Sequence, residues 1–185
     1  MILPVILYGD PVLRKVAVDI DLDYKGLNEL IENMFETMYN AEGVGLAASQ
    51  VGIPIRLFVV DLTPLVKNEP ALEGFKKSFI NAKIIERSGD EELMEEGCLS
   101  IPGIHEEVYR KGHVKMQYFD IEGHKYEDEF SGYLARVIQH EYDHIDGVMF
   151  TDHCSPLRKR LLKGKLTDIS KGIVTTTYRV KPPRN

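Results

Sequence analysis

Residues 131–146, SGYLARVIQHEYDHID, decide how this chain of 185 residues folds. The apolar residues that share one face of a helix in this stretch are Leu134, Val137, Ile138 and Ile145. Ser131 is a preferred residue at a helix start, and Gly147 favours a helix end. The stretch therefore predicts an amphipathic helix whose apolar face is covered by the rest of the chain.

The flanking sequence predicts a second helix and a group of strands. An apolar stripe at helical spacing runs from Leu27 to Met38. Apolar or alternating runs predict strands at residues 55–61, 79–86, 106–110, 114–120 and 125–130, with a hairpin turn at Glu122 and Gly123. These elements indicate an α+β fold, in which antiparallel sheets pack around a central helix formed by residues 131–146.

The remaining segments are a connection and a C-terminal region. Residues 62–77 contain two prolines and mixed charges, and they predict a long surface loop. A helix is expected after Pro156, followed by a strand over residues 173–180. The length favours a single domain, residues 1–185, with a basic C-terminal segment at residues 155–185.

Composition and charge narrow the function classes. Hydrophobic residues make up 43% and charged residues 28% of the chain, as in globular proteins. No run approaches the ~20 apolar residues of a membrane helix, and the opening run lacks a basic leader. Two cysteines cannot build a disulfide scaffold, so we expect a cytoplasmic protein. We expect neither a membrane nor DNA as a partner.

The central helix carries the motif His140-Glu141-Tyr142-Asp143-His144, an H-E-x-x-H. Residues four apart lie one turn apart on a helix, so both imidazoles can reach one metal ion. Glu141 lies beside them, near enough to accept a proton from a water that the metal activates. The pattern predicts a hydrolytic metal site, although a surface helix can match it by chance.

Two classes of metallopeptidase are excluded because the chain lacks their third metal ligand. A metzincin requires a histidine where this chain has Phe150, and a thermolysin-like site requires a later glutamate, which is absent after Glu141. Cys98, in the sequence EEGCLSIP, is the candidate third ligand because a thiolate binds borderline metals well. Taken alone, this cysteine is more typical of a buried core position, and it is the histidine pair without a third partner that favours a ligand.

A third segment, GVGLAASQ at residues 43–50, is rich in small residues. Its two glycines leave room for an extended peptide beside Val44 and Gly45. The Gln50 amide can donate a hydrogen bond to a developing oxyanion. On the central helix, the positions that flank the metal on the same face are Tyr133, Arg136 and Val137. Val137 would supply an apolar wall, whereas Arg136 would contribute only its stem.

Together, GVGLAASQ, EGCLS and QHEYDH occur in the order of three signature motifs of bacterial peptide deformylases, and the chain resembles that family over roughly residues 1–155. The resemblance implies removal of the formyl group from formyl-methionine of newly made polypeptides, with release of formate. It implies that Cys98, His140 and His144 hold a divalent metal, Fe²⁺ in the cell, with zinc, nickel or cobalt as alternatives in isolated protein. The ligand chemistry alone favours zinc.

The resemblance also implies roles for individual residues. Glu141 is expected to be the general base and acid, and Gln50 and the Leu99 N–H are expected to be the oxyanion donors. The backbone of Val44 and Gly45 would pair with the substrate. A structural ion pair between Glu42 and Arg110 is expected behind the site.

Two other interpretations remain open. Cys98, His140, His144 and Cys154 would complete a closed four-ligand site in a non-catalytic binding module. A different metal-dependent amide hydrolase is the other alternative.

Charge is distributed unevenly along the chain. Residues 155–185 carry a net charge of +8, and the rest carries −14. A basic end on an acidic body suggests contact with a polyanion, here ribosomal RNA, although a solvated helix face gives the same pattern.

Overall fold

The computed structural model describes residues 1–65 and 74–183. A five-stranded antiparallel sheet has the order β2-β3-β4-β5-β6, and a separate parallel pair joins β1 to β7. The strands are β1 (Val5–Ile6), β2 (Gly45–Ala47), β3 (Leu57–Asp61), β4 (Lys76–Cys98), β5 (Ile101–Phe119), β6 (Lys125–Ser131) and β7 (Val180–Lys181). The helices are α1 (Leu27–Asn40), α2 (Gly132–Ile145) and α3 (Pro156–Ser170), with short 3₁₀ helices at Pro11–Arg14, Ala48–Val51, Thr63–Leu65 and Phe150–His153. No helix among the described residues is long and apolar enough to cross a membrane.

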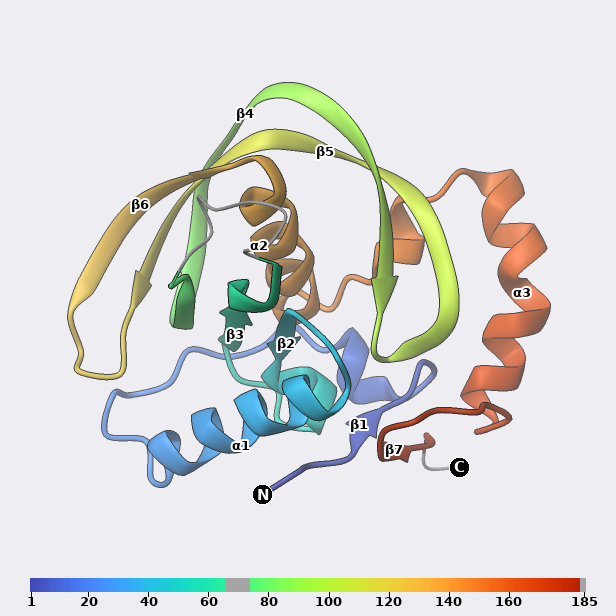
Figure 1. Cartoon of the computed structure of the whole chain (residues 1–185), viewed down its shortest axis with the longest axis horizontal. Coiled ribbons are helices and arrows are strands. Elements are labelled where there is room, and N and C mark those ends of the chain that lie inside the picture. Colours follow the sequence, from blue (N-terminus) through green and yellow to red (C-terminus); the bar gives the residue numbers. More distant parts are fainter. Residues whose placement is uncertain (66–73, 184–185) are drawn as a thin grey trace.

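The α+β class and the central helix are confirmed. The two long strands β4 and β5 arch over α2, while α1 lies below it and α3 stands to one side (Figure 1). Val137, Ile138 and Ile145 of α2 belong to a core that includes Phe58 of β3 and Phe79 of β4, whose rings stack 4.6 Å apart. The helix that carries the motif is therefore held by the sheet on its apolar side.

The ends of α2 and the predicted hairpin turn are also confirmed. Asp146 ends the helix, and Gly147 follows with φ +73°. A Cβ atom at Gly147 would lie 2.6 Å from the carbonyl oxygen of Arg14, so the position needs glycine for both space and conformation. The turn between β5 and β6 contains Glu122 and Gly123, with the Asp120 N–H donating to the His124 oxygen.

Three sequence predictions are corrected. Residues 106–110 and 114–120 are not separate strands, because bulges in β4 keep the intervening residues of β5 paired. The strand predicted at 173–180 is wrong except at its end, because only Val180 finds a partner, in β1. The predicted loop at 62–77 ends early, since β4 starts at Lys76, and residues 66–73 lie outside the described residues.

Candidate metal centre and catalytic pocket

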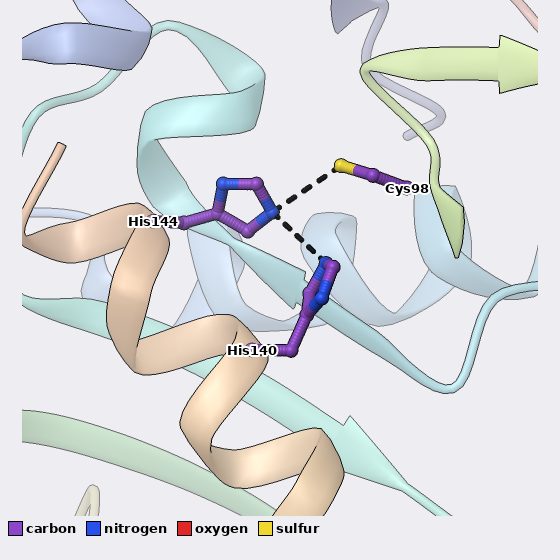
Figure 2. A group of neighbouring side chains, drawn as sticks. All are labelled: Cys98, His140 and His144. Carbon is purple, nitrogen blue, oxygen red and sulfur yellow. Dashed lines mark hydrogen bonds between the residues drawn. The ribbon is translucent and has the colours of Figure 1, made fainter. Parts of the chain in front are cut away.

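The three predicted ligands meet where β4 ends against α2. His144 Nε2 lies 3.3 Å from Cys98 Sγ and 3.3 Å from His140 Nε2, as Figure 2 shows. The three donor atoms all lie within 4.8 Å of one another. Both histidines come from successive turns of α2, and Cys98 is the last residue of β4.

This spacing fits a small divalent cation. Metal–nitrogen bonds of about 2.1 Å and metal–sulfur bonds of about 2.3 Å put tetrahedral donor atoms roughly 3.4–3.6 Å apart. The observed separations of 3.3 Å lie close to that value. One thiolate and two imidazoles form a ligand set that leaves a fourth position open, as catalytic metal sites require.

Glu96 fixes the orientation of His140. Its Oε2 lies 2.9 Å from His140 Nδ1, and the Glu96 side chain is buried. A carboxylate can only accept, so Nδ1 carries the hydrogen and the Nε2 lone pair faces the metal position. Burial raises the pKa of Glu96, but hydrogen bonds from His140 and Arg110 outweigh it and hold the pKa well below its usual range.

Two buried arginines balance the buried carboxylates. Arg110 makes two hydrogen bonds to Glu96, at 2.6 and 3.0 Å, and a third to Asp143 at 2.8 Å. Arg136 donates to Glu96 Oε1 at 2.9 Å and to the Val108 carbonyl oxygen at 2.7 Å. The helix face that carries the ligands is thus supported by paired charges that are almost completely withdrawn from water.

The predicted ion pair between Glu42 and Arg110 is therefore wrong. Arg110 points into the interior, where Glu96 and Asp143 occupy its donors. Glu42 is exposed and follows the last turn of α1 with φ +56°. The two side chains lie in different environments, and the carboxylates that pair with Arg110 are Asp143 and Glu96, the latter two residues before Cys98 in the chain.

Glu141 is the one carboxylate at the centre without a partner. It is 4% exposed, and its Oε2 has no hydrogen-bond partner among the described residues. Burial raises the pKa of Glu141 to about 7. A Cβ atom at Gly45 would lie 2.5 Å from Glu141 Oε1, so the missing side chain of Gly45 makes room for this carboxylate.

Gln50 and Leu99 lie next to Cys98. The Gln50 Oε1 accepts from the Ala47 N–H at 2.9 Å, which turns its amino group toward Cys98. That Nε2 lies 3.5 Å from Cys98 Sγ and 3.2 Å from the Ser100 hydroxyl. Leu99 follows Cys98 directly, in the turn that joins β4 to β5.

A cavity of about 670 Å³ is lined by all the site residues predicted from the sequence except His144, which lies behind Cys98 and His140 in the metal cluster. Its lining includes Val44, Gly45, Gln50, Cys98, Leu99, Tyr133, Arg136, Val137, His140 and Glu141. Strand β2 lies at the edge of the sheet, and β3 is its one partner among the described strands. The backbone of Gly45 therefore borders the cavity on an open strand edge.

The closed four-ligand site is ruled out for the described residues. Cys154 is buried, and its sulfur lies 3.9 Å from the Phe150 carbonyl oxygen. It does not belong to the group of donor atoms formed by Cys98, His140 and His144. The centre therefore keeps three protein ligands.

Sequence reasoning missed two sets of residues around this cavity. Glu96, Arg110 and Asp143 gave no signal as a cluster, although Glu96 lies in the quoted EEGC stretch. The second set is residues 175–178, which line the cavity from the C-terminal end of the chain. Their threonine-rich sequence predicted only a strand.

Comparisons with known proteins point to one family. Residues 2–160 match the family model described as polypeptide deformylase. The chain is 55% identical to a peptide deformylase of Flavobacterium johnsoniae over 98% of this chain and 96% of the relative. It superimposes on the peptide deformylase crystal structure of Thermus thermophilus with a TM-score of 0.82 and 40% identity, over 93% of this chain and 99% of that one. The structure from Thermotoga maritima matches with a TM-score of 0.76 and 42% identity, over 84% of this chain and 99% of that one.

Proposed function

Because the chain belongs to the polypeptide deformylase family, whose members are metal-dependent hydrolases that remove the N-terminal formyl group of nascent polypeptides, we propose that the described cavity is its active site and that Glu141 transfers the proton. The observation that carries this proposal is the convergence of the three donor atoms beside an unpaired buried carboxylate.

The metal would be held by Cys98, His140 and His144, the only group of buried or half-buried donor atoms of this kind among the described residues. One divalent cation there would polarise the formyl carbonyl and activate water for attack. By resemblance to the family we propose Fe²⁺ in the cell, with zinc, nickel or cobalt able to replace it in isolated protein. Glu96 keeps His140 in the form that binds metal.

Glu141 serves as general base and then as general acid. Its carboxylate lies in a buried position where water is scarce, and its free Oε2 can accept a proton from the attacking water. After attack at the formyl carbon, the same proton passes to the departing amine nitrogen. The carbon–nitrogen bond breaks, and formate and the free methionyl amine are released.

The oxyanion that forms during attack requires donors. We assign this role to Gln50 Nε2, which lies beside Cys98, and to the backbone N–H of Leu99. Each is held in place from behind, Gln50 by the Ala47 N–H and Leu99 by the turn between the two long strands. Loss of one such donor typically lowers the rate by about 10²–10³-fold.

The residues that line the cavity would bind the substrate. The backbone of Val44 and Gly45 at the open edge of β2 would pair with the main chain of the formyl-methionyl peptide. Tyr133, Arg136 and Val137 would border the methionine side chain. Arg136 can contribute only its stem, because its guanidinium is buried against Glu96.

The test is formate release from a formyl-Met peptide by the iron- or nickel-loaded protein, compared with acetate release from the acetyl-Met peptide. We expect turnover of the formyl peptide and little of the acetyl peptide, because the formyl carbon carries only a hydrogen. Equal turnover of both peptides would identify a different amide hydrolase, and turnover of neither would contradict the proposal.

We further propose that residues 1–185 act as one domain in the cytoplasm, where nascent chains are made. The pairing of β1 with β7 ties the two ends of the chain together and supports one unit. The exposed basic side chains of α3 would dock on ribosomal RNA. Arg158 is excluded from this surface because Glu106 pairs with it, which leaves Lys159, Arg160, Lys163 and Lys165.

A further inference from the structure

The segment after α3 returns to the active site. Residues 172–178 leave the end of α3 and pass along the turn between β4 and β5 before the chain reaches β7 (Figure 1). This segment lies beyond residue 160, the last that the family model matches. It is nevertheless shared with relatives, since the match to the peptide deformylase of Flavobacterium johnsoniae covers 98% of this chain.

One hydrogen bond joins the segment to the catalytic turn, one lies within the segment, and one joins it to β1. The Tyr178 hydroxyl donates to the Leu99 carbonyl oxygen at 2.8 Å, and the Thr176 hydroxyl donates to the Tyr178 carbonyl oxygen at 2.8 Å. The Val5 N–H donates to the Arg179 carbonyl oxygen at 2.9 Å, where β1 meets β7. Tyr178 thus joins the C-terminal segment to the residue next to the ligand Cys98.

The side of the segment that faces the cavity carries uncharged polar groups. Thr175, Thr176, Thr177 and Tyr178 all line the same cavity as Gly45 and Glu141. Burial and the negative charge of the Cys98 thiolate raise the pKa of Tyr178 to about 12, so its hydroxyl stays a donor at neutral pH.

The backbone of this segment also has N–H and C=O groups that are free to bind a ligand. Among the described residues, no hydrogen bond uses the backbone N–H or C=O of Thr175 or Thr177. The cavity is thereby bordered by two open stretches of backbone, one at the edge of β2 and one in the C-terminal segment. Open backbone groups beside a peptide-binding cavity are suited to pair with an extended peptide of any sequence.

We propose that residues 175–178 form a substrate-binding wall that contacts the peptide residues following the formyl-methionine, with Tyr178 as a positioning residue. The inference rests on the proposed active site. Thr175 and Thr177 would bind the peptide backbone, and Tyr178 would hold this wall at a fixed distance from the Leu99 turn. The wall carries no charge, so it would recognise peptide length rather than side-chain identity.

The test compares substrates of increasing length. We would measure kcat and KM for formyl-Met amide and for formyl-Met-Ala-Ala-Ala amide with the parent, with Tyr178→Phe, and with a chain that ends at residue 171. We expect the kcat/KM ratio of the long to the short substrate to fall about three- to tenfold in Tyr178→Phe, mainly through KM, as removal of one hydrogen bond predicts. In the shortened chain this ratio should fall further.

A matched control and a second readout separate binding from structure. Tyr109→Phe removes the same hydroxyl from a tyrosine of β5 that is 62% exposed and outside the cavity, and it should leave the ratio as in the parent. Calorimetric titration with the product Met-Ala-Ala-Ala amide should show weaker binding to Tyr178→Phe, without any turnover.

If the ratio of kcat/KM for the long substrate to that for the short one is the same in Tyr178→Phe as in the parent, the proposal is overturned. An equal loss of kcat/KM for both substrates would also overturn it, because a purely structural role predicts that result. If the chain that ends at residue 171 does not fold, Tyr178→Phe still tests the proposal. A parent that releases no formate from either substrate would instead contradict the proposed function.

Discussion

Helices α2 and α3 have nearly the same length, 14 and 15 residues, but opposite surroundings. Nine residues of α2 are buried, whereas only Leu162 and Ile169 of α3 are. Two of the charged side chains of α2 in the interior are paired, Arg136 with Glu96 and Asp143 with Arg110, whereas Oε2 of the buried Glu141 has no partner among the described residues. The charged side chains of α3 are exposed.

The difference shows what each helix can do. A buried ion pair is held in one geometry, so the paired charges of α2, Arg136 and Asp143, support the catalytic groups. Exposed charges on α3 cost little and contribute little to stability, but they act at long range on a polyanion. Substitutions on α2 should therefore affect chemistry and folding, and substitutions on α3 should affect encounter.

The largest effect is expected at Glu141. Glu141→Gln keeps the size of the side chain and leaves all three ligands in place, but it cannot accept the proton. We expect kcat to fall by at least ~10³-fold while metal content stays at the parent value. Steady-state kinetics and metal analysis of the same preparation check both statements, and near-parent kcat would remove Glu141 from the mechanism.

The second-largest effect is expected at Cys98, the proposed thiolate ligand of the metal. Cys98→Ser replaces a thiolate with a poorer neutral ligand, so we expect nearly complete loss of metal after dialysis against a chelator. The Cys98 thiolate beside iron is also the expected site of inactivation by air and peroxide. Full metal occupancy in Cys98→Ser would refute the ligand assignment, and an iron form that stays active in air would refute the oxidation prediction.

Glu96→Gln should have an intermediate effect. The amide still reaches His140 but no longer balances Arg110 and Arg136, whose charges remain buried. Loss of such a supporting carboxylate typically weakens metal affinity by about 10–100-fold, and a broken buried pair costs about 3–5 kcal/mol of stability. Competitive chelation and urea unfolding measure the two effects separately. Parent-like values in both would mean that Glu96 neither orients His140 nor stabilises the fold.

Two neighbouring leucines on α3 sharpen the comparison within one helix. Leu162 is 6% exposed and belongs to the core beside β1, whereas Leu161 is 62% exposed. Leu162→Ala should lower the free energy of unfolding by about 2–5 kcal/mol, and Leu161→Ala should change it by less than about 0.5 kcal/mol. Urea titrations of the two variants provide the measurement. Equal losses of stability would show that the two faces of α3 do not differ in packing.

The sequence predicts best where function depends on local spacing. His140 and His144 are four residues apart, so any helix brings them together, and thiolate chemistry singles out Cys98. Glu96, Arg110 and Arg136 were not predicted as a cluster, because their meeting depends on how β4 and β5 curve over α2. Tyr178 lies 79 residues from Leu99 in the chain, and nothing in its local sequence indicates that contact.

The smallest effect on chemistry is expected from the charges of α3. Lys159, Arg160 and Lys163 are exposed, and none of them lines the catalytic cavity. Changing all three to Gln should leave kcat for a short formyl peptide at the parent value. Ribosome affinity should fall, and the slope of log affinity against log salt should flatten by about 0.7–0.9 for each phosphate group that the variant no longer binds.

A control with the same net charge isolates the position of the charges from their number. Lys15, Lys25 and Lys125 are exposed and lie outside α3, so the corresponding triple Gln variant changes the total charge equally. If docking depends on α3, this control binds ribosomes with the parent's salt slope, because its α3 side chains still bind every phosphate group. If both variants bind ribosomes more weakly to the same extent, only the overall charge steers the encounter. If neither does, the basic face of α3 is solvated surface, and its contrast with α2 lies in stability alone.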